Sequence, residues 1–222
     1  MRAALTSFVK DESGLTAIEC VAILAILFPL TFAFAEIQRY NRFARHMWAA
    51  AESLATLVAT RTTVLSGPAL TQDSASIADV LAEAAAPLAA NWREGVGVQA
   101  TLVRFAPEPA GCTTGCAYPI GSIVWTWSGG AAGSRALLQA AGVLRACGAL
   151  APTTDTRPRA GALAAEAFGL QSRIVIDLVY PFKPMLVSDV LGPRAMVWQS
   201  HQAPKADLSN VLSLSDEVTA CP

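Results

Sequence analysis

The chain has 222 residues, of which 53% are hydrophobic and only 15% are charged, whereas typical soluble domains have about 25% charged residues. Disordered chains combine low hydrophobicity with high net charge, so this composition excludes a disordered protein. Sixteen basic and seventeen acidic residues give a formal net charge of −1, and such a balance predicts no binding of nucleic acid. The apolar excess indicates a membrane segment.

An apolar run near the N-terminus is long enough to cross a bilayer. Residues 20–35 carry no charge, and the run reaches back to Leu15 if Glu19 is included. A span needs about 20 residues for a hydrocarbon core of about 30 Å, so Glu19 must then sit close to one membrane face. An uncleaved single-pass anchor is one interpretation. Another is a cleaved secretory signal that ends at the small residues Ala33 and Ala35.

A third interpretation depends on the residues that precede this run. Gly14 ends a short polar leader, and Glu19 is the fifth residue after it. A carboxylate at bilayer depth is costly unless a cation neutralises it. Cleavage after Gly14 would create an amine on Leu15, and the amine of a neighbouring subunit could then neutralise Glu19.

This segment resembles the type IV prepilin signal, and specifically the TadE/TadG-like minor pilins (pseudopilins) of the tight-adherence (Tad/Flp) pilus system. The resemblance covers residues 8–40 and is carried by Phe8, Asp11, Gly14, Ala17, Ile18, Glu19, Ala22 and the stretch 27–30. It implies a membrane-inserted precursor that a prepilin peptidase cuts between Gly14 and Leu15, with Glu19 acting in assembly. The implied partners are membrane lipid, other pilins and pilus assembly proteins.

The same resemblance implies a location. The precursor would sit in the bacterial inner membrane as a single-pass protein, with a cytoplasmic N-terminus and a periplasmic head, before incorporation into an extracellular pilus that serves cell adhesion. Arg39, Arg42 and Arg45 follow the apolar run, and their number favours the opposite orientation by the positive-inside rule. We give them less weight because they lie on a continuing helix, where Glu36 can pair with Arg39.

The helical pattern continues beyond the apolar run. Apolar residues recur at steps of three and four from Ile37 to Val58, and neither Gly nor Pro occurs between Pro29 and Gly67. One helix of about 70 Å is therefore predicted from residue 15 to residue 63, with a local kink at Pro29. Its second half is expected to pack on the head of its own chain. A coiled seam between subunits is the alternative.

The rest of the chain predicts an α+β head with a small antiparallel sheet and flanking helices. Alternating apolar residues predict strands at 96–105, 123–127 and 174–180, and helices are predicted at 75–91, 135–147 and 160–168. Asp177 is expected to face solvent or to pair with an arginine such as Arg173. The predicted domains are a leader (1–14), a long helix (15–65) whose residues 15–35 span the membrane, and an extracytoplasmic head (66–222) that begins with a linker at 66–74.

The cysteines indicate an oxidising compartment. Cys20 lies in the apolar run and is expected to be a small buried residue, whereas the head holds an even set: Cys112, Cys116, Cys147 and Cys221. Four cysteines allow three pairings. We favour Cys112–Cys116, which share a glycine-containing turn, with Cys147–Cys221, which would hold the C-terminal segment. A zinc site lacks a nearby histidine, and a thioredoxin-type site needs two residues between its cysteines, not three.

No catalytic motif is found, and no enzyme activity, metal or cofactor is predicted. The nucleophile pattern GxSxG and the phosphate loop GxxxxGK[ST] are both missing from the sequence. His46 and His201 are expected to be solvated or capped side chains. Trp125, Trp127, Tyr180 and Trp198 are expected to fill the core and its rim. The alternative function is a periplasmic enzyme or binding domain tethered by an uncleaved single-pass helix.

Overall fold

The computed structural model describes residues 12–60, 63–65, 74–76, 95–130, 134–154, 157, 159, 161–184, 194–205 and 218–221. The chain divides into two compact units, residues 1–43 with 184–192, and residues 44–183 with 193–222. Residues 1–11 of the predicted leader, residues 66–73 of the predicted linker and residues 77–91 of a predicted helix lie outside the described residues.

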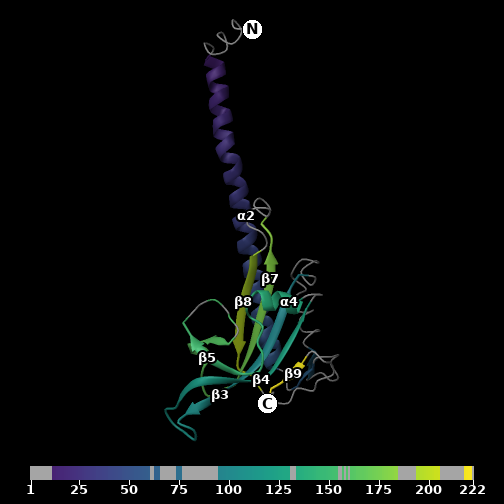
Figure 1. Ribbon diagram of the computed structural model, residues 1–222. Coiled ribbons are helices and arrows are strands. Elements are labelled where there is room, and N and C mark those ends of the chain that lie inside the picture. Colours follow the sequence, from purple (N-terminus) through teal and green to yellow (C-terminus); the bar gives the residue numbers. More distant parts are fainter. Residues whose placement is uncertain are drawn as a thin grey trace. The chain divides into compact units, whose positions relative to one another are not determined.

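Helix α2 (Glu12–Thr60) matches the long helix predicted from residue 15 to residue 63, and it continues through Pro29 without interruption (Figure 1). Its part in the first unit is exposed from Ile18 to Phe34, and every residue of that stretch except Glu19 is uncharged. By length and composition this helix could cross a membrane. Cys20 is exposed on it, so the expectation of a buried thiol was wrong: the apolar side chains around it are themselves exposed.

Just beyond the apolar run, Glu36 and Arg39 form the ion pair that their spacing predicts. Their Oε1 and Nη1 atoms are 3.7 Å apart, three residues along the helix. Pairs at this spacing stabilise a helix only slightly, by about 0.2–0.5 kcal/mol. The pair nevertheless shows that the basic segment after the run belongs to the same helix.

The part of α2 that belongs to the second unit packs into the head. Met47, Ala51, Leu54 and Val58 follow one another at steps of three and four and are fully buried. The main-chain N–H of Lys205 donates to the carbonyl of Ala59, at 2.6 Å. Both figures show this part of the helix running alongside the strand labelled β8 in Figure 1. The interpretation that the apolar stripe packs on the chain's own head is confirmed from Met47 onward.

The head contains a mixed sheet that is larger than predicted. Among the described residues its strand order is β6 (Ala162–Ala164), β5 (Ala149–Thr153), β4 (Ala117–Gly130), β3 (Gly97–Glu108), β7 (Arg173–Phe182) and β8 (Arg194–Gln202), with β9 (Val218–Ala220) also paired to β4. The pairs are antiparallel except β5 with β6. The three predicted strands are the central β4, β3 and β7, so the α+β class is confirmed.

Two alanine-rich segments are less helical than predicted. Helix α4 covers only Ser134–Ala140, because Gly142 takes a positive φ of 71°. The N–H of Gly142 then donates to Gln139 and that of Val143 to Leu138, which is the hydrogen-bond pattern of a Schellman helix end. The predicted helix at 160–168 is wrong. Its residues form β6 and the 3₁₀ turn η2 (Ala165–Ala167), since pairing with β5 overrides the helix propensity of alanine.

The predicted helix at 75–91 is wrong at its start. Residues Ser74–Ser76 form strand β2, which pairs in parallel with β1 (Thr63–Leu65). This pairing holds the backbone extended where serine caps suggested a helix. The helix was predicted to start here because of these serines, but serine favours turns and strand ends as readily as helix caps.

Strand β7 is buried on both faces from Ile174 to Val179. One face carries Ile174, Ile176 and Leu178, which stand opposite Leu102, Ala100 and Val98 of β3. Trp125 and Trp127 are almost fully buried, as expected, and Tyr180 and Trp198 are partly buried. Burial on both faces makes β7 the centre of the head's core.

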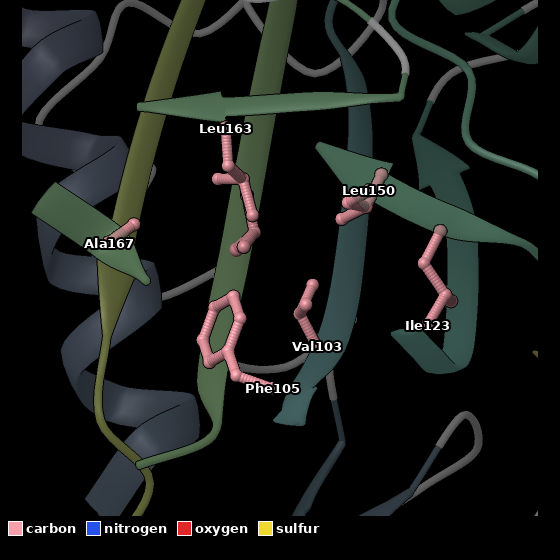
Figure 2. Close-up of a cluster of buried hydrophobic side chains, with 7 residues drawn as sticks. Val103, Phe105, Ile123, Leu150, Leu163 and Ala167 are labelled. Atoms are coloured by element: carbon pink, nitrogen blue, oxygen red, sulfur yellow. The ribbon is translucent and has the colours of Figure 1, made fainter. Parts of the chain in front are cut away.

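The opposite face of the sheet has a two-part apolar core. Figure 2 shows the larger part, in which side chains from five strands and η2 converge: Val103, Phe105, Ile123, Leu150, Leu163, Ala167 and Val175. The smaller part contains Leu138, Val143 and Val179 under helix α4. Along β7, Val175 belongs to the first part and Val179 to the second. Asp177 lies between them, so a charged residue occupies the middle of an apolar face.

Candidate functional site

The residues proposed for processing lie at the start of α2. Gly14 and Leu15 follow its first residue, Glu12, and Glu19 is exposed about one turn further along. Residues 20–35, without a charged side chain, come directly after Glu19 on the same unbroken helix. The acidic side chain of Glu19 therefore lies at one end of an apolar helical segment.

Two disulfides hold the head, in the pairing favoured from the sequence. Cys112–Cys116 closes the connection between β3 and β4, with Cα atoms 5.8 Å apart. Cys147–Cys221 joins the segment after α4 to the end of β9, with Cα atoms 5.3 Å apart. The N–H of Cys221 also donates to the carbonyl of Val124, at 2.9 Å. In the described part of the chain, no group of three or more metal-ligating side chains occurs.

Asp177 forms a buried ion pair with Arg145. The expected pairing with an arginine is confirmed, but the partner is Arg145, not the suggested Arg173, and the carboxylate does not face solvent. Both side chains are fully buried, and Nη1 of Arg145 contacts Oδ2 of Asp177. Asp177 is placed by the middle of β7, and Arg145 by the segment that follows the glycine end of α4. The chain after α4 covers this face of the sheet, so solvent cannot reach the carboxylate.

Polar side chains from the neighbouring strands complete this network. Gln99 of β3 donates to the Thr126 hydroxyl at 2.8 Å and to the carbonyl of Arg145 at 3.0 Å, and it accepts from the N–H of Arg145 at 2.9 Å. Gln199 of β8 donates to Oδ1 of Asp177, at 2.9 Å. Strand register makes this possible, because Asp177 stands opposite both glutamines. Burial lowers the pKa of Arg145 from its usual value to about 10, so its guanidinium stays charged at neutral pH.

A pocket of about 490 Å³ adjoins this network. One wall is strand β8, with Val197, Gln199 and His201; the other consists of β6 and the start of η2. Among the described residues, Thr153, Thr154, Arg157 and Arg159 form its rim. The β8 wall and the rim both contact the network directly. Gln199 bonds to Asp177, and Nη2 of Arg145 donates to the carbonyl of Arg159 at 3.5 Å.

His201 lines this pocket and is partly buried, whereas a solvated or capped side chain was expected. Its pKa is lowered from 6.5 by burial and then by the positive charge of Arg173, while Glu166 acts in the opposite direction. Its imidazole is therefore neutral at neutral pH, with one nitrogen donating and the other accepting.

No protein family matches the chain, and neither the curated proteins nor the solved structures include a significant match. The disulfide cysteines were found from the sequence, but the pocket and its ion pair were not. Their residues come from segments that are far apart in the chain and form no motif. The one available signal was Asp177, a charged residue inside an otherwise apolar strand.

Proposed function

We propose that the chain is a TadE-like minor pilin (pseudopilin) that takes part in the assembly of a tight-adherence type IV pilus. It is inserted in the inner membrane as a precursor, with its leader in the cytoplasm and its head in the periplasm. A prepilin peptidase then cuts after Gly14. The observation that carries this proposal is Glu19, five residues after Gly14, at the head of an uninterrupted apolar helix.

The free-energy cost of placing the Glu19 carboxylate in a membrane supports this proposal. Residues 15–35 of a helix measure about 31 Å, which matches the hydrocarbon core of about 30 Å, so the carboxylate lies inside one face of the membrane. A charged residue at the helix centre costs about 2.5–3.5 kcal/mol on insertion scales. The new amine of Leu15 on a neighbouring subunit would offset much of that cost. The same contact would then favour subunit association.

The head supports export from the cytoplasm. Two disulfides within one small head are typical of oxidising compartments and rare in the cytosol. Export of the head across the inner membrane leaves the N-terminal leader on the cytoplasmic side, where a prepilin peptidase acts on it. This orientation is the one that the pilin interpretation needs.

Processing is tested by the intact mass of the full-length gene product, isolated from membranes of cells with a working prepilin peptidase. We expect a mass lower by residues 1–14, and the full-length mass after Gly14→Leu. Gly169→Ala is the matched control, because a Cβ at Gly169 meets open space, and it should be processed normally. Loss of residues 1–35 would identify a secretory signal instead. An intact chain that retains its first fourteen residues contradicts the proposal.

Glu19→Ala should leave cleavage after Gly14 intact but lower pilus numbers by about tenfold or more, because the assembled subunits lose a charge contact at membrane depth. Pili are counted by electron microscopy, and cleavage is followed by mass. The control is Glu52→Ala, an exposed acidic residue further along α2, which should assemble normally. Unchanged pilus numbers in the Glu19 variant would count against the role of this residue.

The pocket favours a second candidate, a periplasmic binding domain or enzyme tethered by an uncleaved helix. Its volume of about 490 Å³ lies in the range of about 300–1,000 Å³ that is usual for small-molecule sites. A ligand that copurifies with the chain, together with a function that Gly14→Leu leaves unchanged, would favour this candidate over the pilin.

A further inference from the structure

We propose that the Cys147–Cys221 disulfide is a redox switch for the strap, the segment 141–148 that carries Arg145 over the sheet. In the oxidised head the strap is closed and Arg145 is paired with Asp177. Reduction of the disulfide releases the strap and opens the buried ion pair to water. The switch lies in the head alone, so it does not depend on the proposed pilus function.

Polar contacts of one residue attach the middle of the strap to the sheet. The strap is neither helix nor strand. Gln99 of β3 holds the main chain of Arg145 twice: its amide donates to the carbonyl at 3.0 Å, and its oxygen accepts from the N–H at 2.9 Å. The Arg145 side chain adds the ion pair with Asp177 of β7. The strap therefore crosses two strands without pairing with either of them.

The disulfide attaches the strap two residues after Arg145. Cys147 bonds to Cys221, and the N–H of Cys221 donates to the carbonyl of Val124, so the bond ties the strap to β4. The carbonyl of Gly148 accepts one further hydrogen bond at this end, from the N–H of Ile123 at 3.1 Å. One hydrogen bond restrains the chain far less than a covalent tether. The tether therefore raises the effective concentration of the Arg145 guanidinium at Asp177.

A cavity of about 190 Å³ lies between the strap and the sheet. Its described lining includes residues of both: Gln99, Thr126 and Ser128 from the sheet, and Leu144, Ala146 and Cys147 from the strap. The two residues that flank Arg145 thus border a void, where they lose the dispersion contacts that close packing would provide. The polar contacts of Arg145 and the disulfide therefore decide whether the strap stays closed.

The ion pair and the disulfide favour each other. With the disulfide formed, pairing Arg145 with Asp177 costs less chain entropy, and with the ion pair formed, Cys147 stays beside Cys221. By linkage, the factor by which oxidation favours the ion pair equals the factor by which the ion pair favours oxidation. A carboxylate that stays buried without its cation is strongly unfavourable, so release of Arg145 requires that water reaches Asp177.

The switch operates by thiol–disulfide exchange with an external disulfide. Cys147 is exposed and Cys221 is partly buried, so the strap side of the bond is accessible to a reagent. On closing, the two thiols lose two electrons and two protons and form one S–S bond. Oxidised glutathione or a protein disulfide accepts them and becomes two thiols. Opening is the reverse reaction, with two thiols as the reductant.

The test is the redox equilibrium of the full-length chain in detergent, set with mixtures of reduced and oxidised glutathione. Alkylation and peptide mass spectrometry then give the oxidised fraction of each cysteine pair. Asp177→Asn keeps the size of the side chain but removes its charge, and it should shift Cys147–Cys221 towards the dithiol by about fivefold or more. Cys112–Cys116 in the same molecules is the internal reference and should not shift. Val175→Ala, on the same face of β7 but in the other apolar cluster, should shift neither pair.

A second variant and a second measurement complete the test. Gln99→Met removes the contacts with the main chain of Arg145 and should shift the same equilibrium in the same direction, even if Asp177→Asn does not fold. Conversely, the N–H of Arg145 should exchange with solvent about fivefold or more faster in Cys147→Ser with Cys221→Ser than in Cys112→Ser with Cys116→Ser. The proposal is overturned if the folded variants keep the wild-type equilibrium, if both disulfides shift together, or if the two serine variants protect this N–H equally.

Discussion

Asp177→Ala is expected to destabilise the head by about 3–5 kcal/mol, because it leaves the Arg145 guanidinium buried without its counter-charge. The variant also removes the acceptor for Gln199. Total stabilities of folded domains are about 5–15 kcal/mol, so this single change threatens folding itself. Urea unfolding of the full-length chain in detergent, followed by tryptophan fluorescence, measures the effect through the buried Trp125 and Trp127.

The paired replacement Arg145→Met with Asp177→Leu is the control. It removes both charges and fills the space with apolar groups, so it should cost much less than Asp177→Ala and can even stabilise the head. If the single and paired variants unfold at the same urea concentration, the ion pair is not the source of the loss. A single variant as stable as the wild type would contradict the burial of this carboxylate.

Removal of Cys147–Cys221 is expected to cost about 4 kcal/mol, against about 2 kcal/mol for Cys112–Cys116. The cysteines are 74 residues apart in the first pair and 4 in the second, and a bond that closes a longer loop removes more entropy from the unfolded chain. The measurement compares urea midpoints of the two double serine variants with the oxidised wild type. Each variant is the control for the other, since both lose one disulfide.

If the two variants lose equal stability, or if the Cys112–Cys116 variant loses more, the loop-length argument is contradicted.

Removal of Cys147–Cys221 has a second effect that the same experiment reveals. Cys221 holds β9 against β4, where Trp125, Thr126 and Trp127 pair with it. If β9 detaches with its disulfide, the fluorescence of the folded variant changes before any unfolding, and the short-loop variant shows no such change.

Much of the fold follows from local patterns. The apolar residues of β3 and β7 indicated strands, although both strands have long stretches that are buried on both faces. The stripe from Met47 to Val58 repeats at the helical period and identifies the buried face of α2. Strand β8 was missed because the face that carries Val197 continues with Gln199 and His201. These polar residues interrupt the apolar alternation, and they do so where the strand lines the pocket.

The candidate site was harder to predict, for a physical reason. Asp177 needs a cation once β7 is buried on both faces, but the sequence offers many arginines and cannot say which one reaches it. Arg145 reaches it because Gly142 ends α4 early and turns the chain over the sheet. The short strands β5 and β6 were not predicted from the sequence, because their alanines favour a helix until a partner strand is present.

The position of Cys221 has a consequence for biogenesis. It follows every strand of the described sheet in the chain, whereas Cys112 and Cys116 lie together between the first two strands of that sheet. In the proposed export of the head, the small loop can therefore oxidise early. The long-range bond has to wait until all the described strands have been translocated. Export that stalls before this point leaves Cys147 with a free thiol, which alkylation of nascent chains would detect as a marker of incomplete translocation.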